Sequence, residues 1–158
     1  VCNYNAAQIQ EAQKTIQLAS NQVSYSMLNR SIEADLVPLT IAQNIGIIAY
    51  SPMERGLLTG KYFTDSKLKD NDHRNGYFSQ FDLQKVKTLV EELSSLANSK
   101  NATLAQLVLR WTTLQKGITI VLAGARNAEQ AISNAKAMDF DLSASELDFI
   151  NQAISKTK

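Results

Sequence analysis

The sequence predicts an α/β fold in which short parallel strands alternate with longer helices. An apolar-polar alternation at 19–25 and short apolar runs at 45–50 and 118–123 are typical of strands, and helical patterns lie between them. Parallel strands joined through helices require right-handed crossovers, so the sheet is either doubly wound or closed into a barrel. The 158 residues can bury one substantial core, and we expect a single domain over residues 1–158.

The first half of the chain contains two helical patterns. Over residues 6–16, Ile9 and Ile16 lie on the same helical face. A second helix is expected over 32–44, where Pro38 must lie in the first turn or at a kink because it has no N–H to donate. Each of these helices precedes an apolar strand; the second strand, rich in β-branched residues, is expected to be buried on both sides.

The second half of the chain is richer in helical patterns. Capping boxes that begin at Thr103 and Ser143 mark the starts of two of these helices. The helix after Thr103 is expected to bury Leu114 and to end at Gly117, where a glycine allows the chain to turn. The expected helices cover residues 83–97, 103–116, 127–137 and 143–154.

Residues 51–80 form a long connection that includes Gly56, Gly60 and the single histidine, His73. Connections of this length inside compact domains are usually functional or disordered, and we favour a function. His73 lies in a polar stretch and is expected to be a solvated surface residue rather than a site residue.

Composition and charge exclude several classes of protein. Sixteen Lys and Arg against fifteen Asp and Glu give a net charge of +1 without a run of one sign, so no nucleic-acid partner is expected. No apolar stretch approaches the about 20 residues that span a bilayer, and the first residues lack a signal-peptide pattern. We therefore expect no membrane partner and a cytoplasmic location. One cysteine and one histidine cannot form an internal disulfide or a Cys/His zinc site.

Glycine spacing argues against two common nucleotide-binding loops. The glycines never form G-x-G-x-x-G, the dinucleotide fingerprint of doubly wound sheets. The segment 56–62 is one residue short of the Walker A spacing and has Tyr62 where magnesium binding needs Ser or Thr. A nucleotide bound by this chain must be held in another way.

Four segments, in order, resemble motifs of the aldo-keto reductase family. They are Val1-Cys2-Asn3-Tyr4, Asn21-Gln22-Val23-Ser24-Tyr25, Ala49-Tyr50-Ser51-Pro52-Met53-Glu54-Arg55-Gly56-Leu57-Leu58-Thr59-Gly60-Lys61-Tyr62 and Gly124-Ala125-Arg126-Asn127. Each lies at the end of a predicted strand, and together they cover essentially the whole chain. The resemblance implies the C-terminal half of a (β/α)8 TIM barrel, strands five to eight, with the site at the C-terminal rim.

The resemblance also implies NADPH as the cofactor and assigns a set of binding residues. The long connection 51–80 is expected to cover the cofactor. The implied cofactor-binding residues are Cys2, Asn3, Gln22, Tyr50, Ser51, Pro52, Met53, Gly56, Leu58, Lys61, Arg74, Gly124, Arg126, Gln130 and Asn134.

The resemblance implies that the nicotinamide end of the cofactor is bound by Cys2, Asn3, Gln22 and Tyr50. Asn3 and Gln22 carry amides that can match the donor and acceptor of the nicotinamide carboxamide, whereas Cys2 stands where serine is more usual. Tyr50 takes the place of the aromatic ring on which the nicotinamide stacks. Two alternatives are structural: Asn3 or Asn5 caps the first helix, and Tyr50 is a core aromatic at a strand end.

The resemblance implies that positively charged side chains bind the phosphate groups of the cofactor. Lys61 and Arg74 fall where the family covers the diphosphate, and charge-assisted hydrogen bonds suit that role; the alternative is solvated surface charge. Arg126 follows Gly124 and opens a helix, so its guanidinium and free N–H groups are expected to converge on the 2′-phosphate. The alternative is that residues 127–130 form only a capping box, with Arg126 in solvent.

The resemblance also implies where adenine binds and where the catalytic residues lie. Gln130 and Asn134 lie four residues apart on one helical face, where the family contacts adenine, although Ser133 replaces the expected glutamate. The family's catalytic Asp, Tyr, Lys and His come from the first four strands, which no segment here matches. We therefore predict no catalytic or metal-binding residue and expect the chain to be inactive by itself.

The expected function of the complete protein is NADPH-dependent reduction of a small carbonyl substrate, an aldehyde or ketone, to the alcohol by hydride transfer. The chain begins almost on a motif, so we expect a truncated product or a fragment. Its partner is expected to be the missing N-terminal half-barrel or a second copy in a homo-oligomer, because a half-barrel exposes sheet edges and an apolar face. Alternatives are a non-enzymatic NADP(H)-binding regulatory subunit, since voltage-gated potassium channel beta subunits resemble this family, or an inactive truncated fragment.

Overall fold

The computed structural model describes residues 1–64 and 70–157, which gather into two compact units. Unit 1 contains Val1–Pro52 and Thr112–Ala123, and unit 2 contains Met53–Trp111 and Gly124–Lys158. Each unit therefore combines two separate stretches of sequence. The single domain expected from chain length stays a prediction.

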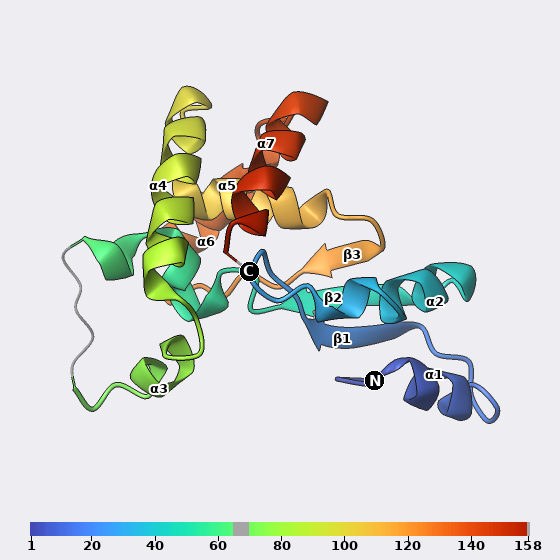
Figure 1. Ribbon diagram of the computed structural model, residues 1–158. Helices are drawn as coiled ribbons and strands as arrows, with labels where there is room; N and C mark the ends of the chain where they lie inside the picture. Colours follow the sequence, from blue (N-terminus) through green and yellow to red (C-terminus); the bar gives the residue numbers. More distant parts are fainter. Residues whose placement is uncertain (65–69, 158) are drawn as a thin grey trace. The chain divides into compact units, whose positions relative to one another are not determined.

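Unit 1 contains a parallel sheet of three strands in the order β1-β2-β3 (Figure 1). The strands are β1 (Ser20–Ser24), β2 (Gly46–Tyr50) and β3 (Ile118–Val121). Both strand pairs are parallel, and a β-bulge or similar irregularity shifts the register between β2 and β3. All three lie within the predicted runs, so the α/β class with parallel strands is confirmed.

The helices of unit 1 are shorter than predicted. Helix α1 (Ala6–Ala12) begins with a capping box between Asn5 and Gln8 and ends four residues early. Ile16 is 61% exposed, so the prediction that it shares the buried face of this helix is wrong. A 3₁₀ turn, η1 (Ser31–Glu33), precedes helix α2 (Leu36–Ala42). Pro38 lies in the first turn of α2, which is one of the two positions expected for it, the other being a kink.

The core of unit 1 lies on one face of the sheet. In β2, Ile47 and Ala49 are fully buried while Gly46, Ile48 and Tyr50 are only half-buried, so the prediction of burial on both sides is wrong. Gly117, with a φ of +83°, precedes β3 where an added Cβ would lie 2.8 Å from Val37 Cγ1. The buried cluster consists of Ile9, Leu18, Val23, Leu36, Val37, Ile45 and Ile47.

Unit 2 is mainly helical, and its long helices α4 and α7 lie side by side (Figure 1). The capping boxes predicted at Thr103 and Ser143 are both present. Helix α5 ends at Thr113, and Leu114 beyond it is 40% exposed, so its predicted burial is wrong. The helices are α4 (Leu83–Ser99), α5 (Leu104–Thr113), α6 (Ala128–Ala135), η4 (Lys136–Met138) and α7 (Ala144–Ser155).

The connection 51–80 contains regular structure. It includes the 3₁₀ segments η2 (Glu54–Thr59) and η3 (Lys61–Phe63) and the short helix α3 (Arg74–Phe78). Residues 65–69 of the expected cofactor-covering connection lie outside the described residues. The described parts are therefore short helical segments that can hold side chains in fixed places.

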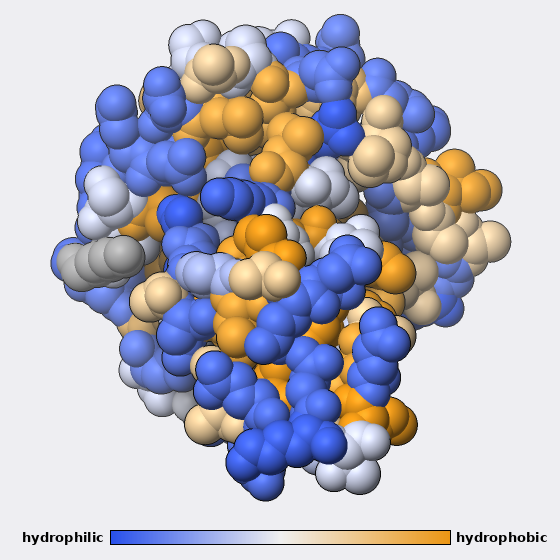
Figure 2. Space-filling view, turned by 90° about the vertical axis from the view of Figure 1, so that its right-hand side faces the viewer, coloured by the Kyte–Doolittle hydropathy of each residue, from blue (hydrophilic) through white to orange (hydrophobic). Residues whose placement is uncertain are grey.

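Apolar side chains reach the surface in several places, and Figure 2 shows them in orange among polar ones on one face. In unit 1, Ile120 is 50% exposed and Leu122 is 42% exposed. Within residues 1–64 and 70–157, β3 pairs with β2 alone, which leaves its other edge without a strand. None of the helices described is long and apolar enough to cross a membrane.

Candidate functional site

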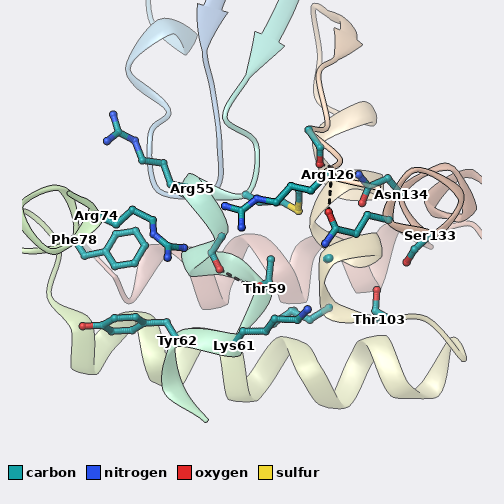
Figure 3. A pocket seen from close by; sticks show the side chains of 16 residues that line it. Arg55, Thr59, Lys61, Tyr62, Arg74, Phe78, Thr103, Arg126, Ser133 and Asn134 are labelled. Carbon is teal, nitrogen blue, oxygen red and sulfur yellow. Dashed lines mark hydrogen bonds between the residues drawn. The ribbon is translucent and has the colours of Figure 1, made fainter. Parts of the chain in front are cut away.

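A cavity of about 470 Å³ lies within unit 2. Its walls come from η2, η3, α3, the first turn of α5, the segment that leads into α6 and α6 itself (Figure 3). These elements are far apart in the sequence, so the fold brings their side chains together. The predicted site residues that line the cavity are Met53, Gly56, Lys61, Arg74, Gly124, Arg126, Gln130 and Asn134.

The cavity is lined by cations. Arg55, Lys61, Arg74 and Arg126 contribute to its wall, whereas none of the lining residues is Asp or Glu. Figure 3 shows the guanidinium groups of Arg74 and Arg126 pointing into the cavity, whereas that of Arg55 points away from them. Such a set of donors suits a polyanion, although Arg74 also pairs with Asp72, which is not among the lining residues.

Arg74 is held in place by a neighbouring carboxylate. Its Nε lies 3.0 Å from Asp72 Oδ1, and its Nη2 lies 2.8 Å from Asp72 Oδ2. The Arg74 backbone N–H also donates to Asp72 Oδ1, at 2.9 Å. Hydrogen bonds from the Arg74 side chain, and then from its backbone, hold the pKa of Asp72 well below its usual range. This two-point contact orients the guanidinium before any ligand arrives.

Replacing Arg74 by glutamine is therefore expected to raise the pKa of Asp72 toward its ordinary value, while the backbone N–H of residue 74 still holds it somewhat lower. In the wild-type protein Asp72 contributes stability above its unfolded-state pKa, and that contribution is lost as the pH falls through the lower folded-state pKa. Carboxyl ¹³C chemical shifts followed through an acid titration measure the change. The matched variant Arg30→Gln, whose partner is Glu33 in unit 1, should leave Asp72 unchanged; an unchanged Asp72 pKa in Arg74→Gln contradicts the assignment.

The turn at one wall of the cavity has an unusual backbone. Glu54 and Arg55 have φ values of 47° and 52°, and Gly56 has a φ of 95°. Positive φ is ordinary for glycine but rare for the other two residues. Thr59 closes the turn with a hydrogen bond from Oγ1 to the Gly56 carbonyl at 2.7 Å (Figure 3). Such backbone strain persists only where surrounding contacts support it, and it is found most often at functional sites.

The segment leading into α6 is closed by its own side chains. The Arg126 N–H donates to Gln130 Oε1 at 2.8 Å, and the Gln130 N–H donates to Asn127 Oδ1 at 2.8 Å. Asn134 Nδ2 donates to the Gly124 carbonyl at 3.2 Å. The expectation that free N–H groups at Arg126 converge on an anion is therefore wrong. Of the alternative, the Asn127 cap and the exposure of Arg126 are confirmed, but the capping box is incomplete, because Gln130 accepts from Arg126 and not from the cap residue.

A second cluster of predicted residues lies in unit 1, at the end of β1 and β2. Tyr50 OH donates to Asn3 Oδ1 at 3.1 Å, and the Asn3 N–H donates to the Gln22 carbonyl at 2.8 Å. Cys2 forms an isolated parallel bridge with Gln22. Asn5 caps α1, so of the two capping alternatives Asn3 is not the cap. The fold thus brings these four predicted residues together.

Three further predicted residues belong neither to the cavity lining nor to the cluster in unit 1. Leu58 is fully buried, and its N–H donates to the Met53 carbonyl at 3.2 Å. Ser51 and Pro52 belong to unit 1 and continue the chain beyond β2. Among the described residues, no group of three or more His, Cys, Asp or Glu could hold a metal ion. His73 is exposed, as expected.

Several lining residues escaped prediction from the sequence. Arg55, Thr59, Tyr62, Phe78 and Thr103 all face the cavity. Thr103 could be identified only as a helix cap, and the aromatic residues meet only in three dimensions, with the Tyr62 and Phe78 ring centroids 5.1 Å apart. The position of Arg55 beside Gly56, in the glycine-containing turn, is the one local signal that pointed to this wall.

The sequence matches one protein family along nearly its whole length. The sequence model of the Aldo/keto reductase family matches residues 1–155. The chain is 32% identical over 155 residues to an uncharacterized oxidoreductase of Mycobacterium tuberculosis, covering 97% of this chain and 48% of that protein. It is 29% identical over 150 residues to an NADH-specific methylglyoxal reductase of Escherichia coli, covering 95% of this chain and 46% of that protein.

A solved structure has the same fold along nearly the whole of this chain. The glycerol dehydrogenase from Gluconobacter oxydans aligns with a TM-score of 0.89 and 25% identity, covering 99% of this chain and 48% of that one. This likeness confirms the predicted partial TIM barrel. The chain spans about half the length of the relatives that it matches.

Proposed function

Because this chain belongs to the aldo/keto reductase family, we propose that it holds the cofactor of an NADPH-dependent oxidoreductase that reduces a small aldehyde or ketone to the alcohol. The observation that carries the proposal is the cavity of unit 2, whose lining among the described residues includes four cations and no carboxylate. The diphosphate and 2′-phosphate of NADPH supply the matching negative charge.

The cations of the cavity have separate tasks in this proposal. Lys61 and Arg74 bind the diphosphate, and the pairing of Arg74 with Asp72 fixes its direction. Arg126 binds the 2′-phosphate through its guanidinium, because its backbone N–H is already bonded to Gln130. An extra phosphate contact of this kind favours NADPH over NADH. The relative named as NADH-specific belongs to the same family, so the choice between the two must be measured.

The cluster in unit 1 suits the nicotinamide. Asn3 and Gln22 offer amide donors and acceptors for the carboxamide. Tyr50 donates to Asn3, which leaves the Asn3 amide nitrogen as a donor and fixes the orientation of the side chain. When bound, the cofactor supplies the hydride, and the residues of this chain orient the ring that carries it.

The remaining parts of the reaction are assigned to residues outside this sequence. We propose that the acid–base groups and much of the carbonyl site lie in an N-terminal half-barrel, so that the 158-residue chain is inactive by itself. The span of about half of each relative and the exposed edge strand β3 support this proposal. A cytoplasmic location is proposed with it, because a chain with one cysteine needs no oxidising compartment.

The test is a titration of NADPH and NADH with the wild-type protein and with Lys61→Ala, followed by nicotinamide fluorescence. NADPH is expected to bind at least about 10-fold more tightly than NADH, which is about 1.4 kcal/mol. Lys61→Ala should weaken both cofactors about 3- to 10-fold, because both contain the diphosphate. The control Lys87→Ala removes a cation of α4 that pairs with Glu91 and should change neither affinity.

Equal affinity for NADPH and NADH contradicts the cofactor assignment, and an unchanged Lys61→Ala variant contradicts the diphosphate site. Turnover of a simple aldehyde by the full-length protein tests the reductase activity. Tight NADPH binding with negligible turnover of several aldehydes would instead favour a regulatory subunit.

A further inference from the structure

One side chain in unit 2 contacts both strained residues of the cavity wall. Tyr77, in α3, donates a hydrogen bond from its hydroxyl to Glu54 Oε2. The Arg55 guanidinium carbon lies 3.8 Å from the centre of the same ring, a distance typical of a cation–π contact. The Tyr77 hydroxyl therefore contacts Glu54, and the face of its ring contacts Arg55.

These contacts are where the backbone needs support. Glu54 and Arg55 both have positive φ, a conformation that non-glycine residues adopt rarely. Glu54 is also fully buried, and a buried carboxylate is stable only with hydrogen-bond donors around it. The Tyr77 hydroxyl is one such donor. Tyr77, which lies over 20 positions further along the chain, thus contacts both the strained turn and the buried carboxylate.

Tyr77 also belongs to the element that carries a cavity cation. Helix α3 begins at Arg74 and includes Phe78, and both of these residues line the cavity. Phe78 is almost fully buried and packs edge-to-face on Tyr62 of η3. A shift of α3 relative to the turn would therefore move Arg74 relative to Gly56 and Thr59 on the opposite wall.

We propose that Tyr77 is a positioning residue for diphosphate binding, joining the strained turn 54–56 to the helix that carries Arg74. This inference rests on the proposed function, because it names the diphosphate as the group that these two walls hold. Tyr77 does not line the cavity itself and acts through Arg74 and the turn. Arg126, on the segment before α6, is outside this linkage, so binding at the 2′-phosphate should not depend on it.

The test compares two phosphate probes in the full chain by calorimetry: inorganic pyrophosphate and adenosine 2′-monophosphate. Tyr77→Phe keeps the ring and removes only the hydroxyl, and it is expected to weaken pyrophosphate binding about 5- to 10-fold. Affinity for adenosine 2′-monophosphate should stay within about twofold of wild type. Tyr25→Phe is the matched control, since it also removes a tyrosine hydroxyl that donates to a carboxylate, that of Glu33 in unit 1, and both probes should bind it as before.

A second variant separates positioning from general loss of stability. In Glu54→Gln/Tyr77→Phe the buried charge is gone, so this protein should fold even where the single variant does not, and it should still show the selective loss. Pyrophosphate binding at the wild-type level in either folded variant, or equal weakening of both probes, overturns the role of Tyr77. Failure of the wild-type protein to bind pyrophosphate overturns the proposed function itself.

Discussion

Replacing Arg126 by alanine is expected to lower the affinity for NADPH about 10- to 100-fold while leaving the affinity for NADH unchanged. The loss corresponds to the charge-assisted hydrogen bonds between one guanidinium and one phosphate. The effect should come from the side chain alone, because the Arg126 N–H donates to Gln130 and remains bonded in the variant. Fluorescence titration of both cofactors measures the ratio of the two affinities directly.

Lys136→Ala is the control for this experiment. Lys136 is an exposed cation that follows α6 and lies outside the cavity lining. Its removal lowers the net charge by the same amount, so a general electrostatic effect would appear in both variants. Equal weakening of NADPH and NADH in Arg126→Ala would mean that the residue stabilises the segment before α6 rather than binding a 2′-phosphate.

Replacing Ile47 by alanine is expected to lower the free energy of unfolding by about 2–5 kcal/mol. Ile47 is fully buried in the central strand β2 and belongs to the apolar cluster of unit 1, so the shorter side chain leaves a cavity that its neighbours fill only in part. Urea denaturation followed by circular dichroism measures the change.

The matched change is Ile16→Ala, which removes the same atoms from a side chain that is 61% exposed. Its effect should stay within about 0.5 kcal/mol. A similar loss in both variants would show that residues 13–16 are packed more tightly than their exposure indicates.

Strands β2 and β3 were predictable because each is a short apolar run, and β1 because apolar and polar residues alternate along it. The ends of the helices were not predictable. Ile16 and Leu114 fit the helical period, yet α1 and α5 end before them and both side chains are exposed. Periodicity records which face a residue would occupy in a helix, and it does not record where the helix stops. The capping boxes at Thr103 and Ser143 were reliable, because the cap and its partner are only three residues apart.

The candidate site was predictable only in part: its cations could be identified from the sequence, and its side-chain contacts could not. Lys61 and Arg126 could be singled out from motifs and Arg74 from its place in the long connection, and the structure brings all three to one cavity. The bond between Arg126 and Gln130 could not be foreseen, because it depends on the rotamer of one side chain. Tyr77 carries no motif of its own, and its contact with Glu54 exists only after the chain has folded back.

The interleaving of the two units has a consequence for synthesis on the ribosome. The central strand β2 ends at Tyr50, but its second neighbour β3 begins only at Ile118. Most of unit 2 is therefore translated while β2 still has an open edge. Unpaired strand edges favour pairing with other chains, and contacts between distant residues form slowly. Nascent chains should be most prone to aggregate while the ribosome translates the stretch between these two strands.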